Sequence, residues 1–341
     1  MKSRQVLLVA RPVGAPKPSN FNLVDVDVRD PGPGEILVRN IYMSVDPYMR
    51  GRMNEKQTYA QAWQVGQPAD GRAVGEVMTS HHPSFPVGAL VVSNLGWREH
   101  FVSNGEGLMA IDRALASPSA FLGVLGVPGF TGWYGLKEIG KPKAGETLVV
   151  SGAAGATGSI VVQIGKILGL RVVGTAGTDD KCAWLTKDLG ADAAINYRHG
   201  DLEEQLRAAC PKGVDVYFEN VGGAILDAVL GLVNPFARIA LCGMISQYNL
   251  EAPAPGPRNL RNMVGNRVLM QGFIISDHMK RYPEFLHEVG GWLKTGRIRY
   301  EETVVEGIDR AVTAFLGLFS GDNTGKMVVR LGLEPARSGS R

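Results

Sequence analysis

The residues that most clearly suggest chemistry are three glycines separated only by small residues, Gly152, Gly155 and Gly158. They follow the apolar run 148–150, which predicts a buried parallel strand, and precede residues 159–169, whose apolar positions recur at helical spacing. A backbone without Cβ atoms can turn tightly here and let a pyrophosphate approach the amides of the helix N-terminus. Residues 153–158 fit the dinucleotide-binding pattern, with Ala in place of its first glycine. The segment predicts a dinucleotide site; the alternative is a glycine turn that only packs helix on strand.

The residues after the next expected strand bear on the choice between NAD and NADP. An NAD site usually has Asp or Glu near this strand end, where it binds the ribose 2′-hydroxyl. Here residues 175–178 contain no carboxylate, and the first nearby cation is Lys181. A charge-assisted bond to a 2′-phosphate contributes about 1.5 to 3 kcal/mol, or about tenfold to hundredfold preference, so we expect NADPH. The alternative is that Asp179 and Asp180 cap the next helix, with Lys181 a solvated charge and Asp179 available to a ribose.

The composition is that of an ordinary globular protein, with 45% hydrophobic and 20% charged residues among 341. The net charge of +3 arises from 36 basic and 33 acidic residues without a basic block, which argues against binding to nucleic acid or a membrane surface. Cys182, Cys210 and Cys242 stand far apart without a CxxC motif, as expected in a reducing compartment. No signal-like or long apolar segment is evident, so we expect a cytoplasmic enzyme, with a loose tail at 334–341.

The elements that must position these residues fall into two parts. In the first 125 residues, short β-type runs separated by Pro and Gly predict a small β-rich barrel; the runs are 5–10, 36–42, 71–78, 89–95 and 100–102. The centre alternates, with strands expected at 148–150, 172–175, 193–196, 214–218, 238–242 and 268–275, and helices at 179–189, 201–209 and 224–232. Six strands with crossover helices predict an α/β fold with a doubly wound parallel sheet of the Rossmann type.

The end of the chain is expected to form a helix after Pro283, another at 308–318 and a last strand at 326–331, and to rejoin the first domain. Ligands of a doubly wound sheet lie beyond the carboxyl ends of its strands. The candidates there are Tyr197, 220–223, 242–244 and 273–275. The six histidines show no metal-ligand spacing, so no metal site is expected.

Seven motifs spread over the chain resemble the medium-chain dehydrogenase/reductase superfamily. They are DPYMRGRM (46–53), VPGFTGWYGL (127–136), AAGATGS (153–159), NVGG (220–223), CGMIS (242–246), MQGFII (270–275) and DNTGKMVV (322–329). They are similar to the zinc-independent branch of prostaglandin reductases, alkenal double-bond reductases and curcumin reductases. In zinc-bearing members a Gly-His-Glu supplies a metal ligand, whereas this chain has Val74-Gly75-Glu76 and lacks the structural cysteine quartet. The resemblance therefore implies no metal.

The resemblance also implies a GroES-like catalytic domain at residues 1–127 and 301–341, a Rossmann domain at 128–300, and a homodimer. By family position, the pyrophosphate would be held by Gly155, Ala156, Thr157 and Gly158, and the 2′-phosphate by Lys181 and Tyr197. Ribose and phosphate contacts would come from Asn220, Cys242, Gly243, Met244, Ile245, Ser246 and Tyr248. Phe273, Ile274 and Ile275 would lie beside the nicotinamide, and Asn323 would reach the cofactor. A plain buried strand is the alternative for 273–275.

The proton donor is the open position in this comparison. Relatives often place a Tyr eight residues before the Phe of the QGF motif, where this chain has Gly265. Tyr48 is our candidate instead, since a phenol could hydrogen-bond the substrate carbonyl or enolate. The alternative is that Tyr48 only packs, and that water or the cofactor ribose delivers the proton.

Three functions follow as hypotheses. The first is an NADPH-dependent reductase of the C=C bond of enones and enals, in which hydride goes to the β-carbon. The second is an NADPH:quinone reductase of the same superfamily. The third is an NADPH-binding sensor that lost catalysis, suggested by Gly265.

Overall fold

The computed structural model describes residues 1–56 and 58–335. The chain divides into two compact units: Met1–Leu122, Glu302–Asp322 and the C-terminal residues from Met327 form the first, and Gly123–Glu301 with Asn323–Lys326 form the second. The expected domain bounds, 1–127 with 301–341 and 128–300, stay a prediction. Residues 336–341 of the expected tail lie outside the described residues.

The second unit is built on a six-stranded sheet with the order β10-β9-β8-β11-β12-β13. Its strands are β8 (Thr147–Val150), β9 (Arg171–Ala176), β10 (Ala193–Asn196), β11 (Val214–Glu219), β12 (Val233–Leu241) and β13 (Leu269–Gly272). All neighbouring strands are parallel, which confirms the predicted Rossmann-type sheet. The chain leaves β8 toward β9 and β10 and later returns to β11 on its other side, so the carboxyl ends of β8 and β11 are the expected ligand position.

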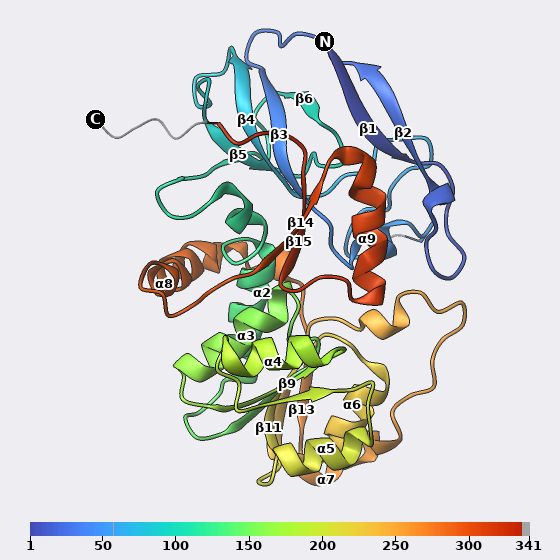
Figure 1. Ribbon diagram of the computed structural model, residues 1–341, viewed down its shortest axis with the longest axis vertical. Helices are drawn as coiled ribbons and strands as arrows, with labels where there is room; N and C mark the ends of the chain where they lie inside the picture. The colour runs from blue at the N-terminus through green and yellow to red at the C-terminus, as the bar shows by residue number, and fades with distance from the viewer. Residues whose placement is uncertain (57, 336–341) are drawn as a thin grey trace. The chain divides into compact units, whose positions relative to one another are not determined.

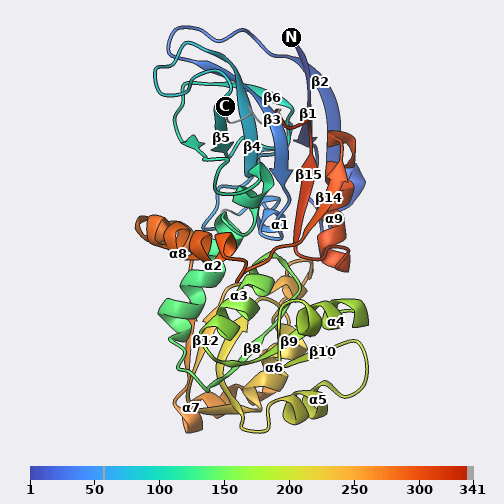
Figure 2. The ribbon, with the colours of Figure 1, turned by 60° about the vertical axis from the view of Figure 1, so that its left-hand side comes forward.

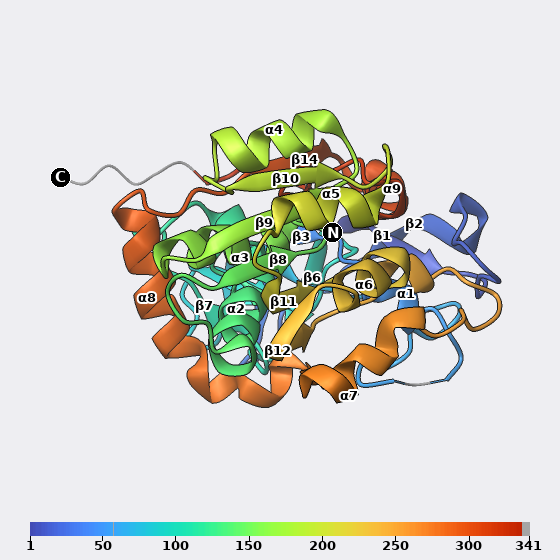
Figure 3. The ribbon, with the colours of Figure 1, turned by 90° about the horizontal axis from the view of Figure 1, so that it is seen from below.

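Helices cover both faces of this sheet (Figure 3). The helices of the unit are α2 (Val127–Tyr134), α3 (Ala156–Ile167), α4 (Asp179–Lys187), α5 (Leu202–Ala209), α6 (Gly223–Leu230), α7 (Asn262–Asn266) and α8 (Tyr282–Lys294). On one face, α5 and α6 bury Leu206 and Val229 against Val149, Val173 and Tyr217 of the strands. On the other face lie α3 and α2, and a π-helix at Gly135–Gly140, which we did not predict, follows α2.

The first unit is rich in antiparallel strands (Figures 1 and 2). A two-stranded sheet contains β1 (Lys2–Leu8) and β2 (Phe21–Asp27). A seven-stranded sheet contains β3 (Ile36–Ser44), β4 (Ala73–Ser80), β5 (Leu90–Ser93), β6 (His100–Ser103), β7 (Met109–Ala110), β14 (Glu302–Glu306) and β15 (Lys326–Arg330). β15 pairs with β3, so the C-terminal strand shares a sheet with N-terminal strands.

Two short helices, α1 (Met49–Arg52) and α9 (Ala311–Ser320), belong to the first unit. Its core is aromatic: Trp97 stacks on Phe21 with ring centroids 5.8 Å apart and meets Phe315 edge-on at 6.0 Å. We did not predict β2, whose side chains are mostly exposed or half-buried and therefore carry a weak apolar signal. Within the described part of the chain, no helix combines the length and apolar character needed to span a bilayer.

Candidate cofactor site

The glycine turn leads directly from β8 into α3. Gly152 has a left-handed φ of 56°, and its carbonyl accepts the amide of Gly155 at 3.0 Å. Gly155 is the N-cap residue of α3, yet no side chain caps this helix and no acidic residue occupies its first turn. First-turn amides have no acceptor within the helix and lie at the positive end of its dipole. This uncapped end suits a pyrophosphate, and it contains the four predicted contacts Gly155, Ala156, Thr157 and Gly158.

Gly158 has no room for a side chain. A Cβ atom there would stand 2.4 Å from the carbonyl oxygen of Gly152 and 2.8 Å from the Cα of Ala153. Both are backbone atoms, which cannot rotate away as the end of a flexible side chain could. This glycine therefore sets how closely α3 approaches the turn.

The end of β9 has a hydroxyl and a guanidinium beside Gly177. A Cβ on Gly177 would be 2.8 Å from the Tyr197 hydroxyl and 3.4 Å from Nε of Arg198. The next helix, α4, has Thr178 as its N-cap, and the Thr178 hydroxyl accepts the amide of Lys181 at 3.3 Å. The strand end is thus followed by a helix turn that contains the predicted Lys181. We did not predict a role for Arg198 at the 2′-phosphate end, although a cation directly after Tyr197 indicates one.

The alternative use of Asp179 and Asp180 as helix caps is wrong, because Thr178 is the cap. The Asp179 carboxylate instead accepts the side-chain amide of Asn196 at 2.8 Å and lies 3.8 Å from Nδ1 of His199. These contacts hold Asp179 toward the loop after β10.

Residues 220–223 form a turn at the end of β11 that is attached to the end of β8. Asn220 donates its backbone amide to Oγ of Ser151 at 2.8 Å and its side-chain amide to the carbonyl of Ser151 at 2.7 Å. Gly222 and Gly223 both have left-handed φ angles, 78° and 58°, which side chains disfavour. Asn220 is therefore fixed where the glycine turn begins.

The loop after β12 folds back onto this turn. The carbonyl of Asn220 accepts the amide of Ile245 at 3.2 Å. Ser246 donates its amide and its hydroxyl to the carbonyl of Val221, at 3.0 and 2.6 Å. The predicted ribose and phosphate contacts on this loop are thereby joined to the 220–223 turn.

Tyr248 and Cys242 belong to the same loop. The hydroxyl of Tyr248 accepts the amide of Met244 at 3.3 Å, and a Cβ on Gly243 would be 3.0 Å from that hydroxyl. Burial raises the pKa of the Cys242 thiol to about 12, and the charge of Glu219 adds to the rise. The thiol therefore stays protonated near neutral pH and is a weak nucleophile.

Phe273 leaves the sheet directly after β13. Its ring centroid lies 5.9 Å from that of Tyr134, and a Cβ on Gly135 would be 2.6 Å from its Cζ. The predicted strand through Ile275 is wrong, because β12 ends at Leu241, which pairs with Gly272, and no ladder partner remains beyond it. Phe273, Ile274 and Ile275 are all half-buried.

The segment with Asn323 is attached to the glycine turn. Asn323 donates its side-chain amide to the carbonyl of Gly325 at 2.7 Å. The amide of Gly325 binds the carbonyl of Ala154 at 2.8 Å, and Gly325 forms a β-bridge with Gly155. Among the predicted cofactor residues, Asn323 is therefore linked to the turn although it is far away in sequence.

Tyr48, the predicted catalytic residue, belongs to the first unit, where it precedes α1 and packs against the core. Burial raises the pKa of its phenol above the ordinary value; Asp46 adds to the rise and Arg52 opposes it. The phenol therefore keeps its proton throughout the neutral and mildly basic range.

The described residues contain no cluster of three or more His, Cys, Asp or Glu side chains that could hold a metal ion. Glu76, at the position of the family's zinc motif, binds Arg39 at 2.8 Å. The donors at this position therefore do not fit a zinc site.

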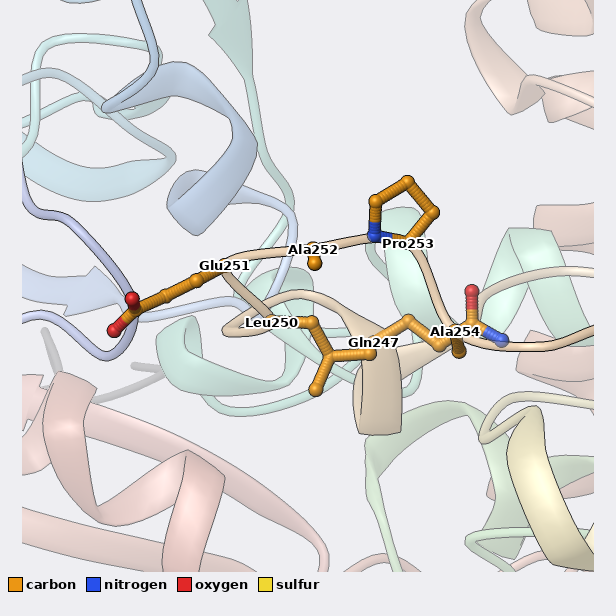
Figure 4. Close-up of a pocket in the computed structure, with 6 residues that line it drawn as sticks. All are labelled: Gln247, Leu250, Glu251, Ala252, Pro253 and Ala254. Carbon is orange, nitrogen blue, oxygen red and sulfur yellow. The ribbon is translucent and has the colours of Figure 1, made fainter.

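A hollow of about 280 Å³ lies along the loop that follows Tyr248 (Figure 4). Its lining residues are Gln247, Leu250, Glu251, Ala252, Pro253 and Ala254. In Figure 4 the side chains of Gln247 and Glu251 extend in opposite directions. None of the predicted site residues lines this hollow, so we do not assign it to the cofactor.

Known proteins resemble this chain over nearly its whole length. Residues 4–111 match the family described as the N-terminal domain of oxidoreductase, and residues 156–290 match the family described as zinc-binding dehydrogenase. The chain is 44% identical to the NADPH-dependent curcumin reductase of Escherichia coli, over 97% of both chains. It is 40% identical to the NADP⁺-dependent 2-alkenal reductase of Nicotiana tabacum, over 98% of this chain and 99% of the relative. The crystal structure of CurA from Vibrio vulnificus in complex with NADPH matches with a TM-score of 0.93 and 45% identity, over 97% of this chain and all of that one.

Proposed function

Because the chain belongs to the zinc-independent branch of the medium-chain dehydrogenase/reductase superfamily, we propose that it reduces the C=C bond of α,β-unsaturated ketones and aldehydes with NADPH. The observation that carries this proposal is the similarity to a curcumin reductase and a 2-alkenal reductase over at least 97% of the chain. The uncapped start of α3 supports it independently, because it offers amides to a pyrophosphate.

The chain's own residues have distinct tasks in this proposal. The amides that begin α3 bind the pyrophosphate, and Lys181, Tyr197 and Arg198 bind the 2′-phosphate at the end of β9. The turn with Asn220 and the loop from Cys242 to Tyr248 hold the ribose and phosphates. Phe273 to Ile275 lie beside the nicotinamide, and Asn323 closes the site from the last segment.

NADPH held by these residues would supply a hydride for the β-carbon of the substrate, and a proton at the α-carbon would complete the saturated product. The developing enolate oxygen requires a hydrogen-bond donor. We assign this role, and the supply of the proton, to the phenol of Tyr48, which stays protonated because burial raises its pKa. In the alternative, Tyr48 only packs, and water or the cofactor ribose delivers the proton.

Tyr48→Phe tests this role. We expect kcat to fall by about a hundredfold, since a positioned proton donor contributes on that order, while the Kd of NADPH stays the same. Because the pKa of Tyr48 is raised, the wild-type kcat should not fall up to about pH 9 through loss of this proton. Steady-state rates at saturating NADPH measure both effects. Tyr59→Phe, at a tyrosine that is 62% exposed in the same unit, is the control and should be silent. An unchanged kcat in Tyr48→Phe would favour the packing alternative.

Incubation with NADPH and a panel of enones, enals and quinones tests the activity itself. We expect loss of the reduced-nicotinamide absorbance with enones and a saturated ketone as product. A hydroquinone as the only product would favour the quinone reductase. Tight NADPH binding without turnover of any acceptor would favour the sensor.

We further propose that the enzyme is a homodimer that associates through β13. In the part of the chain that the structure describes, this strand lies at the edge of the sheet and pairs with β12 alone, and Leu269 is 50% exposed. Val264 on the preceding helix is 82% exposed, and the exposed ring of Phe236 is covered on one face by Arg267 at 4.5 Å. An edge strand whose outer side has no partner among the described residues is a template for another chain, and a second copy could pair with it about a two-fold axis.

Leu269→Lys should therefore produce a monomer, because it places a charge in the proposed interface. Size-exclusion chromatography with light scattering measures the mass. Leu333→Lys, at another exposed leucine far from this edge in sequence, is the control and should leave the mass unchanged. A wild-type protein that is already monomeric would refute the dimer.

We also infer a cytoplasmic location. Cys182, Cys210 and Cys242 are all free thiols, as expected of a protein kept in a reducing compartment. Fractionation of cells that express the protein tests this inference.

A further inference from the structure

A carboxylate with no exposed surface lies beneath the turn at residues 220–223. Glu219, the last residue of β11, is 0% exposed. Its Oε1 accepts Oγ of Ser151 at 2.8 Å, the amide of Gly222 at 2.8 Å and the amide of Val221. Its Oε2 accepts the hydroxyl of Tyr217. One side chain therefore receives four hydrogen bonds, two of them from the backbone of the turn.

The main chain of Glu219 extends the same network. Its carbonyl accepts the amides of Cys242 and Gly243, at 2.9 and 3.1 Å. Ser151, which donates to the Glu219 side chain, accepts the amide of Asn220 at 2.8 Å. Through Glu219, the start of the glycine turn, the 220–223 turn and the loop after β12 are therefore joined.

Packing alone gives no reason for a carboxylate here. A buried charge is costly, and apolar side chains of similar volume usually serve stability as well or better. The described contacts of the Glu219 carboxylate include no cation, and burial raises its pKa although the four hydrogen bonds oppose the rise. A buried carboxylate at this position is explained if its role is to hold the conformation of the turn at residues 220–223.

That conformation is an unusual one. Gly222 and Gly223 are consecutive left-handed residues, and a Cβ on Gly223 would be 3.1 Å from Oγ of Ser246. The two amides that Glu219 binds, those of Val221 and Gly222, are where the chain enters this conformation. Without an acceptor beneath them, these two amides would lose their hydrogen bonds, and the turn that follows Asn220 would lose two contacts that hold its conformation.

We propose that Glu219 is a positioning residue for the cofactor: it holds Asn220 and the loop at 242–246 in the arrangement that receives the ribose and phosphates of NADPH. The inference rests on the proposed function, and it assigns Glu219 no contact with the reacting atoms. Its effect should therefore appear in cofactor affinity and not in the chemical step.

Glu219→Gln tests the proposal, because glutamine keeps the shape but removes the charge that strengthens the bonds to the turn. We expect the Kd of NADPH, measured by calorimetry, to rise at least about tenfold, while kcat at saturating NADPH stays within about threefold of wild type. Val91→Ala is the control, since Val91 is fully buried in β5 of the first unit, in a core that contains no residue of the Glu219 network. It should lower Tm and leave the Kd unchanged. An unchanged Kd in Glu219→Gln would overturn the proposal.

The wild-type protein provides a second test that needs no variant. If Glu219 preorganises the turn, the backbone amides of residues 219–224 in the intact protein should exchange their hydrogens slowly without NADPH. Added NADPH should then change this exchange rate only slightly. Fast exchange that becomes slow only when NADPH is added would overturn the inference. Failure of the wild type to bind NADPH at all would instead refute the proposed function, so the two failures are distinct.

Discussion

Gly158→Ala is expected to raise the Kd of NADPH by more than about a hundredfold, because the added methyl group must displace the turn that receives the pyrophosphate. The new Cβ would lie 2.4 Å from the carbonyl oxygen of Gly152 and 2.8 Å from the Cα of Ala153. No rotamer change relieves contacts between a Cβ and backbone. The start of α3 must therefore move away from β8, and its amides move with it.

The same substitution should lower the free energy of unfolding by about 1 to 3 kcal/mol, the usual cost of overpacking a tight site. Calorimetric titration with NADPH and thermal unfolding measure the two effects. Gly291→Ala in α8 is the matched control, since a Cβ there would meet nothing within 4 Å. This control should bind NADPH normally. Because alanine is the better helix former, its unfolding temperature should rise slightly. Normal NADPH affinity in Gly158→Ala would contradict the assignment of the turn to the pyrophosphate.

Lys181→Ala is expected to reduce the preference for NADPH over NADH by about tenfold to hundredfold, the contribution of one charge-assisted bond to a 2′-phosphate. Lys181 lies in the first turn of α4, shortly after the end of β9, where the hydroxyl of Tyr197 and the guanidinium of Arg198 lie beside Gly177. Arg198→Ala should have an effect of the same sign. The double variant should lose most of the preference for NADPH over NADH, because both cations, Lys181 and Arg198, would be removed.

The ratio of kcat/KM for the two cofactors measures this preference, and the Kd of each cofactor measures it without turnover. Lys187→Ala, which removes an exposed lysine from the last turn of the same helix, is the control for a general change of charge. It should leave the ratio unchanged. If Lys181→Ala and Lys187→Ala discriminate equally well, Lys181 does not bind the 2′-phosphate.

Predictions that rest on patterns of neighbouring residues are confirmed more often than predictions that depend on distant parts of the chain. The six parallel strands were recognised because buried strands and amphipathic helices have different apolar spacings within short windows. The strand expected through Ile275 was wrong because an apolar run does not reveal where its partner strand stops, and β12 stops opposite Gly272. The alternative in which Asp179 and Asp180 cap α4 is wrong, because Thr178, just before them, makes the capping bond.

The sequence by itself determined the family, the glycine turn and the absence of a histidine in the zinc motif at Val74-Gly75-Glu76, because each depends on residues that are adjacent in the chain. Only the tertiary structure decided what holds the site together. Glu219 and Ser151 are 68 residues apart and share a hydrogen bond, and Gly325 binds the glycine turn at Ala154. Such contacts have no periodicity or spacing, since they arise only when folded strands bring their ends to the same edge of a sheet.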